Sequence, residues 1–239
     1  MYFFLSGEGS TDLGTSKDRP GPLAMIVDQI IQEHHEYSPL ECGRAVHVNR
    51  SVLKRIKSDA SKSRNKRSVR LPSAKIRPEY RDNYENAKVL SRISQDFIDE
   101  KPKNDRDFVA VLFHDTDTPK EQDWKDMRNA ILTGFHDGGI EPRGVASVAR
   151  PISEAWWLSA LDRKVDPKRD GTKYEESRRG KAKGEHHLKK ELGDDAQRDA
   201  LVAMVKSKEI DYKLIDSDSF LVFRRDFETA VGLEYLHHT

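Results

Sequence analysis

The run FVAVLFHDTDT, residues 108–118, is the clearest indication of the fold class of this chain. Its first six residues, Phe108–Phe113, are apolar on both faces of an extended strand, which is typical of a central strand in a parallel sheet. The polar residues His114 to Pro119 end this strand, and a helix is expected from about Lys120 to Phe135. A buried strand followed by a helix predicts an α/β fold.

The rest of the chain repeats this alternation of strands and helices. Shorter strands are expected at Tyr2–Ser6 and Val145–Val148, and a short helix is expected after Ser153, whose hydroxyl is a typical N-cap. The remaining apolar periodicities predict helices over 23–36, 82–100, 196–206 and 220–236. The sequence therefore predicts one α/β domain over residues 1–239, with a mostly parallel central sheet flanked by helices.

Composition narrows the class of protein. The 239 residues carry 42 Lys and Arg against 41 Asp and Glu, a formal net charge of +1, so nucleic acid can be attracted only by local patches. Cys42 is the only cysteine, which excludes an internal disulfide and a cysteine-rich zinc site. Apolar runs are too short for a membrane span, and MYFFLSGEGS does not resemble a signal peptide. A cytoplasmic protein is expected.

Two polar, basic stretches interrupt the pattern, at about 54–80 and 163–190. We interpret them as insertions that loop out of the core, and their cations are candidates for holding nucleic-acid phosphates. The alternative, that they are merely solvated surfaces, stays open. The candidate nucleic-acid-binding residues are Arg64, Lys66, Arg67, Arg70 and Lys181.

Acidic residues follow three of the predicted strands. In open parallel sheets the chemistry lies at the carboxyl ends of the strands, and carboxylates gathered there would favour a divalent cation such as Mg²⁺. Each residue taken alone could instead be a turn former or a helix cap. Together they form the candidate metal ligands: Glu8, Asp12, Asp115, Asp117 and Glu154.

The order of these motifs resembles the Toprim domain. A glutamate in a Gly-rich turn after the first strand, then a hydrophobic strand ending in Asp-x-Asp, is found in topoisomerases, primases and nucleases of the overcoming-lysogenization-defect (OLD) type. The chain is most similar to a small stand-alone Toprim-like family of unknown function from prokaryotic mobile and defence loci. The similar segments are FFLSGEGSTD (3–12), VLFHDTDT (111–118), Pro151, Glu154, Trp156 and Leu158 of one Pro-x-x-Glu-x-Trp-x-Leu segment, and DSDSFLVF (216–223).

The resemblance implies a Rossmann-like Toprim fold and a Mg²⁺- or Mn²⁺-dependent nuclease with two ions. Glu8 would be a metal ligand or general acid/base, Asp115 and Asp117 would hold metal, and Asp12 and Glu154 would complete a second position. Lys183, in a Gly-bounded loop, is a candidate for stabilising charge on the scissile phosphate. By the same resemblance, a separate ATPase subunit and a role against phage or plasmids are expected, with DNA favoured over RNA as substrate.

Two other functions stay open. Asp115 and Asp117 after an apolar strand also fit the first motif of haloacid-dehalogenase-like phosphatases, with Asp115 as nucleophile and Gly193–Asp195 as a late acidic motif. That motif should end a hydrophobic strand, and residues 186–192 (HHLKKEL) do not form one. The chain could instead be a non-catalytic subunit that binds nucleic acid or an ATPase. Homo-oligomerisation is left undecided.

Overall fold

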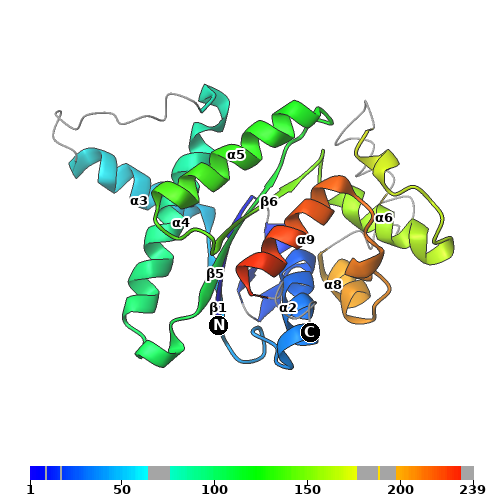
Figure 1. Cartoon of the computed structure of the whole chain (residues 1–239), viewed down its shortest axis with the longest axis horizontal. Coiled ribbons are helices and arrows are strands. Elements are labelled where there is room, and N and C mark those ends of the chain that lie inside the picture. The colour runs from blue at the N-terminus through cyan, green and yellow to red at the C-terminus, as the bar shows by residue number, and fades with distance from the viewer. Residues whose placement is uncertain (9, 17, 64–75, 177–187, 189–197, 233–239) are drawn as a thin grey trace.

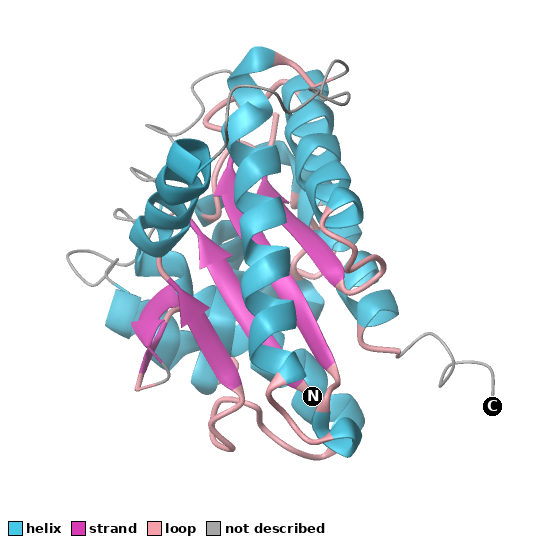
Figure 2. Ribbon diagram, turned by 90° about the vertical axis from the view of Figure 1, so that its left-hand side faces the viewer, coloured by secondary structure: helices cyan, strands magenta, loops and turns pink. Residues whose placement is uncertain are grey.

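A four-stranded parallel sheet forms the centre of the protein. The structure, a computed structural model, describes residues 1–8, 10–16, 18–63, 76–176, 188 and 198–232. The strands lie side by side in the order β4-β1-β5-β6 and point the same way (Figure 2). They are β1 (Tyr2–Gly7), β4 (Ala45–Val48), β5 (Phe108–Asp115) and β6 (Gly144–Ala149). The predicted α/β class, the parallel sheet and the central place of β5 are confirmed.

Helices cover both faces of the sheet (Figure 1). One face carries α3 (Arg50–Ser63), α4 (Arg81–Asp99) and α5 (Glu121–Asp137), and the other carries α2 (Pro22–His35), α6 (Glu154–Val165), α8 (Arg198–Lys206) and α9 (Asp218–Ala230). Smaller elements are α1 (Ser10–Leu13), the antiparallel pair β2 (Gly14–Ser16) and β3 (Arg19–Pro20), and short 3₁₀ turns at Pro78–Tyr80, Lys103–Asp105, Thr172–Tyr174 and Tyr212–Leu214. Within the described ranges, no helix is both long and apolar enough to span a bilayer.

The alternation of side chains along β5 explains these two layers. Val109, Val111 and Phe113 point to the layer of α2, α6, α8 and α9, whereas Phe108 and its alternate neighbours point to α4 and α5. A strand that is buried on both faces must be apolar throughout. Trp156 of α6 packs at the centre of the first layer, 5.2 Å from the Phe220 ring of α9 between centroids.

Two elements differ from the sequence prediction. The short strand β4 was not predicted, although it pairs with β1 from Phe3 against Ala45 to Ser6 against Val48. Residues 54–63 were expected to loop out, but they continue α3, whose Leu53 is fully buried against α4. The cations of α3 lie along a helix because one apolar face anchors that helix.

The second predicted insertion is exposed over 164–170, but Gly171 and Glu175 within it are buried. Glu175 is fully buried and accepts a 2.8 Å hydrogen bond from Arg150, which follows β6. It also accepts hydrogen bonds from the backbone of Ser219 at 3.0 Å and from the hydroxyls of Ser217 and Ser219 at the start of α9. A buried charge needs such partners, so this segment is tied to the loop that follows β6.

Candidate active site

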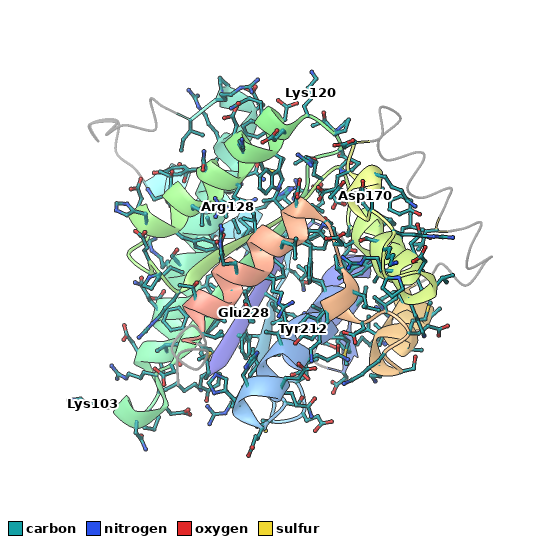
Figure 3. All side chains as sticks on the ribbon, turned by 45° about the vertical axis from the view of Figure 1, so that its right-hand side comes forward. Lys103, Lys120, Arg128, Asp170, Tyr212 and Glu228 are labelled. Carbon is teal, nitrogen blue, oxygen red and sulfur yellow. The ribbon has the colours of Figure 1, made fainter. Side chains whose placement is uncertain are left out.

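The candidate site lies at the carboxyl end of the parallel sheet. Lys103, before β5, and Lys120, after it, mark the two ends of the sheet (Figure 3). Asp115 ends β5 and Asp117 follows it, at the Lys120 end. The loop after β5 is tied to the loop after β6, because the backbone N–H of Asp117 donates to the Pro151 carbonyl at 2.9 Å and that of Thr116 donates to Ala149 at 3.1 Å. The two loops therefore form one rigid edge.

Ser153 joins two of the predicted acidic residues. Its hydroxyl donates to Asp12 Oδ1 at 2.6 Å, and its backbone N–H donates to Asp115 Oδ1 at 3.0 Å. Ser153 is 1% exposed, so these contacts are sheltered. Ser153 is at the N-cap of α6, as the sequence predicts, but its hydroxyl makes no capping hydrogen bond. It is used instead to bring α1 and the end of β5 together.

The environment of the carboxyl groups around Ser153 disfavours their ionised forms. Burial, followed by the charges of Asp12 and Glu154, raises the pKa of Asp115 well above its usual value, and Asp117 adds a smaller contribution. Burial also raises the pKa of Asp12 to about 6, against the opposing effect of the Ser153 hydrogen bond. We call Asp12, Asp115, Asp117 and Glu154 the acidic cluster. Repulsion of this kind is what a bound cation relieves.

The two outer members of the acidic cluster come from turns. Asp117 is exposed and adopts a left-handed backbone conformation with φ of 54°, which aspartate tolerates better than most residues. Glu154 is the first residue of α6 and is partly buried. Asp12, Asp117 and Glu154 all affect the pKa of Asp115, so these four of the five predicted metal ligands are electrostatic neighbours.

Glu8, the fifth, has different partners. Its Oε2 lies 2.9 Å from His114 Nδ1 and its Oε1 accepts a 2.7 Å hydrogen bond from Arg50. The hydrogen bond to His114 has the largest effect, and with the help of Arg50 it lowers the pKa of Glu8 to about 2 despite partial burial. The pairing follows from the sheet, because Gly7 of β1 lies opposite Phe113 of β5. Glu8 is therefore an ionised carboxylate with both oxygens engaged.

The donor set of the acidic cluster suits a hard divalent cation. Mg²⁺ and Mn²⁺ prefer carboxylate oxygens. Burial accounts for the raised pKa of Asp12, and burial together with the neighbouring carboxylates accounts for that of Asp115. However, across the described ranges no three Asp, Glu, His or Cys side chains converge as closely as ligands of one ion do. The chemistry of the donors fits a metal, whereas this arrangement of the side chains is more open than a loaded site.

Several predicted residues cannot be placed. The structure does not describe the candidate catalytic Lys183, nor the candidate phosphate-binding cations Arg64, Lys66, Arg67, Arg70 and Lys181. Gly193–Asp195, the late acidic motif of the phosphatase alternative, also falls outside the described residues.

Sequence reasoning missed three residues of this edge. His114 was left out of the site, although its place directly before Asp115 in β5 was a usable signal. Arg50 was missed because β4, which precedes it, is only four residues long. Ser153 was noticed as a cap, and nothing in the sequence indicates that its hydroxyl reaches Asp12, which lies 141 residues away in the chain.

Comparison with known protein families, with curated proteins and with solved structures finds no match for the chain.

Proposed function

We propose that the protein is a divalent-metal-dependent nuclease of the Toprim type, with its active site at the carboxyl edge of the sheet. The observation that supports this most is the acidic cluster, in which Asp12 and Asp115 are held by Ser153 and have raised pKa values. Burying ionisable groups near one another destabilises a fold, and such groups gather preferentially at functional sites. The order of the motifs in the sequence, which resembles that of Toprim proteins, supports the same function.

In this proposal the acidic cluster would hold Mg²⁺ or Mn²⁺ through Asp12, Asp115, Asp117 and Glu154. A bound cation of this kind polarises a phosphodiester and lowers the pKa of water. Ser153 keeps the Asp12 and Asp115 oxygens at fixed positions. Because the pKa values of both carboxyls are raised, a bound cation would stabilise their ionised forms and lower both pKa values.

Glu8 has another role in this proposal. With a pKa of about 2 it is a weak base, and a general base works best when its pKa is near the working pH. We therefore assign Glu8 to orienting His114 and Arg50, which it contacts through separate oxygens. Arg50, oriented by Glu8 at the same carboxyl edge of the sheet, is in this proposal the cation that contacts a substrate phosphate.

The proposal is tested by cleavage of end-labelled DNA and RNA, single- and double-stranded, with Mg²⁺, Mn²⁺ or EDTA. Replacing Asp115→Asn should lower cleavage by on the order of 100-fold or more, because loss of a metal ligand removes several kcal/mol of transition-state stabilisation. Asp107→Asn is the matched control, since Asp107 is exposed and precedes β5 at the opposite end of the sheet. Cleavage that survives EDTA, or that Asp115→Asn leaves unchanged, would refute a metal-dependent site at the acidic cluster.

A non-catalytic binding subunit is the second candidate. It is favoured by the open arrangement of the carboxylates, which do not converge on one point within the described part of the chain. Calorimetric titration of Mg²⁺ and Mn²⁺ into wild type and Asp115→Asn separates the two candidates when it is combined with the cleavage assay. Metal binding without cleavage of any substrate favours the non-catalytic subunit. The ATPase partner and the role in defence remain proposals that rest on the resemblance.

A further inference from the structure

A cavity of about 280 Å³ lies beside Glu8, at the carboxyl ends of β1 and β4. It is bounded by Leu5 and Leu13 on its apolar side and by His47, Asn49, Arg50 and Ser51 on its polar side. We call it the β1–β4 pocket. Its lining shares no residue with the acidic cluster, and its Arg50 also bonds to Glu8.

The lining of the β1–β4 pocket offers one cation to an anion, and this cation also pairs with Glu8. Among the described residues that line the pocket, Arg50 is a cation and none is a carboxylate. Arg50 is held in place by the 2.7 Å hydrogen bond to Glu8 Oε1, so its guanidinium is already oriented. The pocket also lies at the start of α3, a 14-residue helix beginning at Arg50, whose N-terminal end adds partial positive charge.

Two lining residues have unused hydrogen-bonding capacity. His47 Nε2 and Arg50 Nε are enclosed, and neither has a hydrogen-bond partner among the described residues. Enclosed polar atoms normally find partners, so both atoms are available to a polar ligand or to water. Burial lowers the pKa of His47, so its neutral ring can donate or accept, as contact with a sugar hydroxyl or a base requires.

A second cation lies on α3, one turn beyond Arg50. Lys54 follows Arg50 by four residues and therefore lies on the same side of the helix. It is exposed, and no ion pair to it is found in the part of the chain that the structure describes. Lys57, by contrast, is paired with Asp82 at 3.3 Å. A phosphate backbone entering the pocket would meet Arg50 first and Lys54 one turn later.

We propose that the β1–β4 pocket binds one nucleotide unit of a single-stranded nucleic acid, with Arg50 contacting its phosphate. The choice of nucleic acid as the source of the phosphate rests on the proposed nuclease function. The size argues for a single strand, because the cavity is just below the range of roughly 300–1,000 Å³ usual for small-molecule sites. One nucleotide can enter such a space, whereas a paired base must first leave the stack.

The test measures binding without cleavage, using short fluorescent single-stranded DNA and RNA, the matching duplexes and a nucleoside monophosphate, all in EDTA. Arg50→Gln should weaken single-strand binding by roughly 10-fold or more and reduce the salt-dependence slope by about 0.7. Ser51→Trp, at an exposed position on the rim, should block the pocket and weaken binding similarly. The matched controls are Arg55→Gln, exposed elsewhere on α3, and Ser51→Ala. Thermal melting checks that every variant is folded.

Each outcome decides between the pocket and its rivals. Selective loss in Arg50→Gln and Ser51→Trp supports the β1–β4 pocket. Equal, small losses of single-strand affinity in Arg50→Gln and Arg55→Gln would show a diffuse basic surface and refute the pocket. The pocket would also be refuted if the duplex or the free monophosphate bound as tightly as the single strand. The two proposals can fail independently. If the protein binds single strands in EDTA through Arg50 but cleaves nothing with any metal, only the nuclease proposal is refuted. If Ser51→Trp cleaves with an unchanged KM, only the pocket proposal is refuted.

Discussion

Replacing Asp12→Asn should stabilise the protein at neutral pH. Burial raises the pKa of Asp12 from 3.8 to about 6, so the folded protein keeps a proton that the unfolded chain has already lost. Between these values the unfolded chain binds fewer protons, and the free energy of unfolding therefore falls as the pH rises. Above pH 6 this loss is complete. Asparagine carries no charge at any pH, and its side-chain oxygen can still accept the Ser153 hydrogen bond.

The size of the effect follows from the same pKa values. A rise from 3.8 to about 6 corresponds to about 3 kcal/mol of unfolding free energy. A small part of the side chain reaches solvent, and the amide of asparagine needs an acceptor, so we expect about 1–3 kcal/mol at pH 7. For a domain of this length that is a rise in Tm of roughly 2–12 °C. Near pH 4 the two proteins should be equally stable.

The assay is urea unfolding of wild type and Asp12→Asn in EDTA, at several pH values between 4 and 7. Asp107→Asn removes a charge at an exposed position and should change stability by no more than about 0.5 kcal/mol at any pH. Saturating Mg²⁺ should narrow the gap at pH 7, since a cation bound to the acidic cluster stabilises the wild type more. A variant that is no more stable than wild type at pH 7 would show that the Asp12 carboxylate is not penalised, and the reasoning about the cluster would fail.

Three further substitutions test other parts of the structure. Glu8→Gln should lower the free energy of unfolding by about 1 kcal/mol above pH 4.5. It should also make that free energy less dependent on pH between 4.5 and 2, because the wild-type carboxylate has a pKa of about 2 but is partly exposed. Gly7→Ala should cost at least about 1 kcal/mol in urea unfolding, since its Cβ would lie 2.3 Å from the Phe113 carbonyl oxygen. Trp156→Ala should cost about 3–5 kcal/mol, whereas Leu221→Ala, 43% exposed, should change little.

The sequence predicted those parts of the fold that local pattern determines. β5 was predictable because a strand buried on both faces has no polar residue until its end. β4 was not, since four residues give little periodicity and this strand is defined by pairing with β1. α3 was not predicted because most of its residues are charged or polar, although Val52, Leu53 and Ile56 have helical spacing. Its Leu53 finds a fully buried position only against α4.

The candidate site shows the same division. Asp12, Asp115 and Glu154 could be predicted as neighbours, because the ends of parallel strands share one edge of the sheet. The separation of Glu8 from them could not be predicted. It depends on Arg50, which enters from the end of β4, and on the register that places His114 beside Glu8. Contacts between residues far apart in the chain are set by topology and leave no mark in local sequence.

The carboxyl edge of the sheet therefore has two parts with opposite electrostatics. The same kind of group has a pKa of about 2 at Glu8 and about 6 at Asp12. An ion pair that stabilises the fold is enough to explain Glu8. Asp12 and Asp115 have no such explanation, because their burial destabilises the folded state and an amide would satisfy the hydrogen bonds from Ser153 equally well. Groups that a fold holds at a net loss of stability are expected where they serve a function. This asymmetry is the reason for proposing the chemistry at the acidic cluster, whereas the proposed contact with phosphate rests on Arg50 and the pocket beside it.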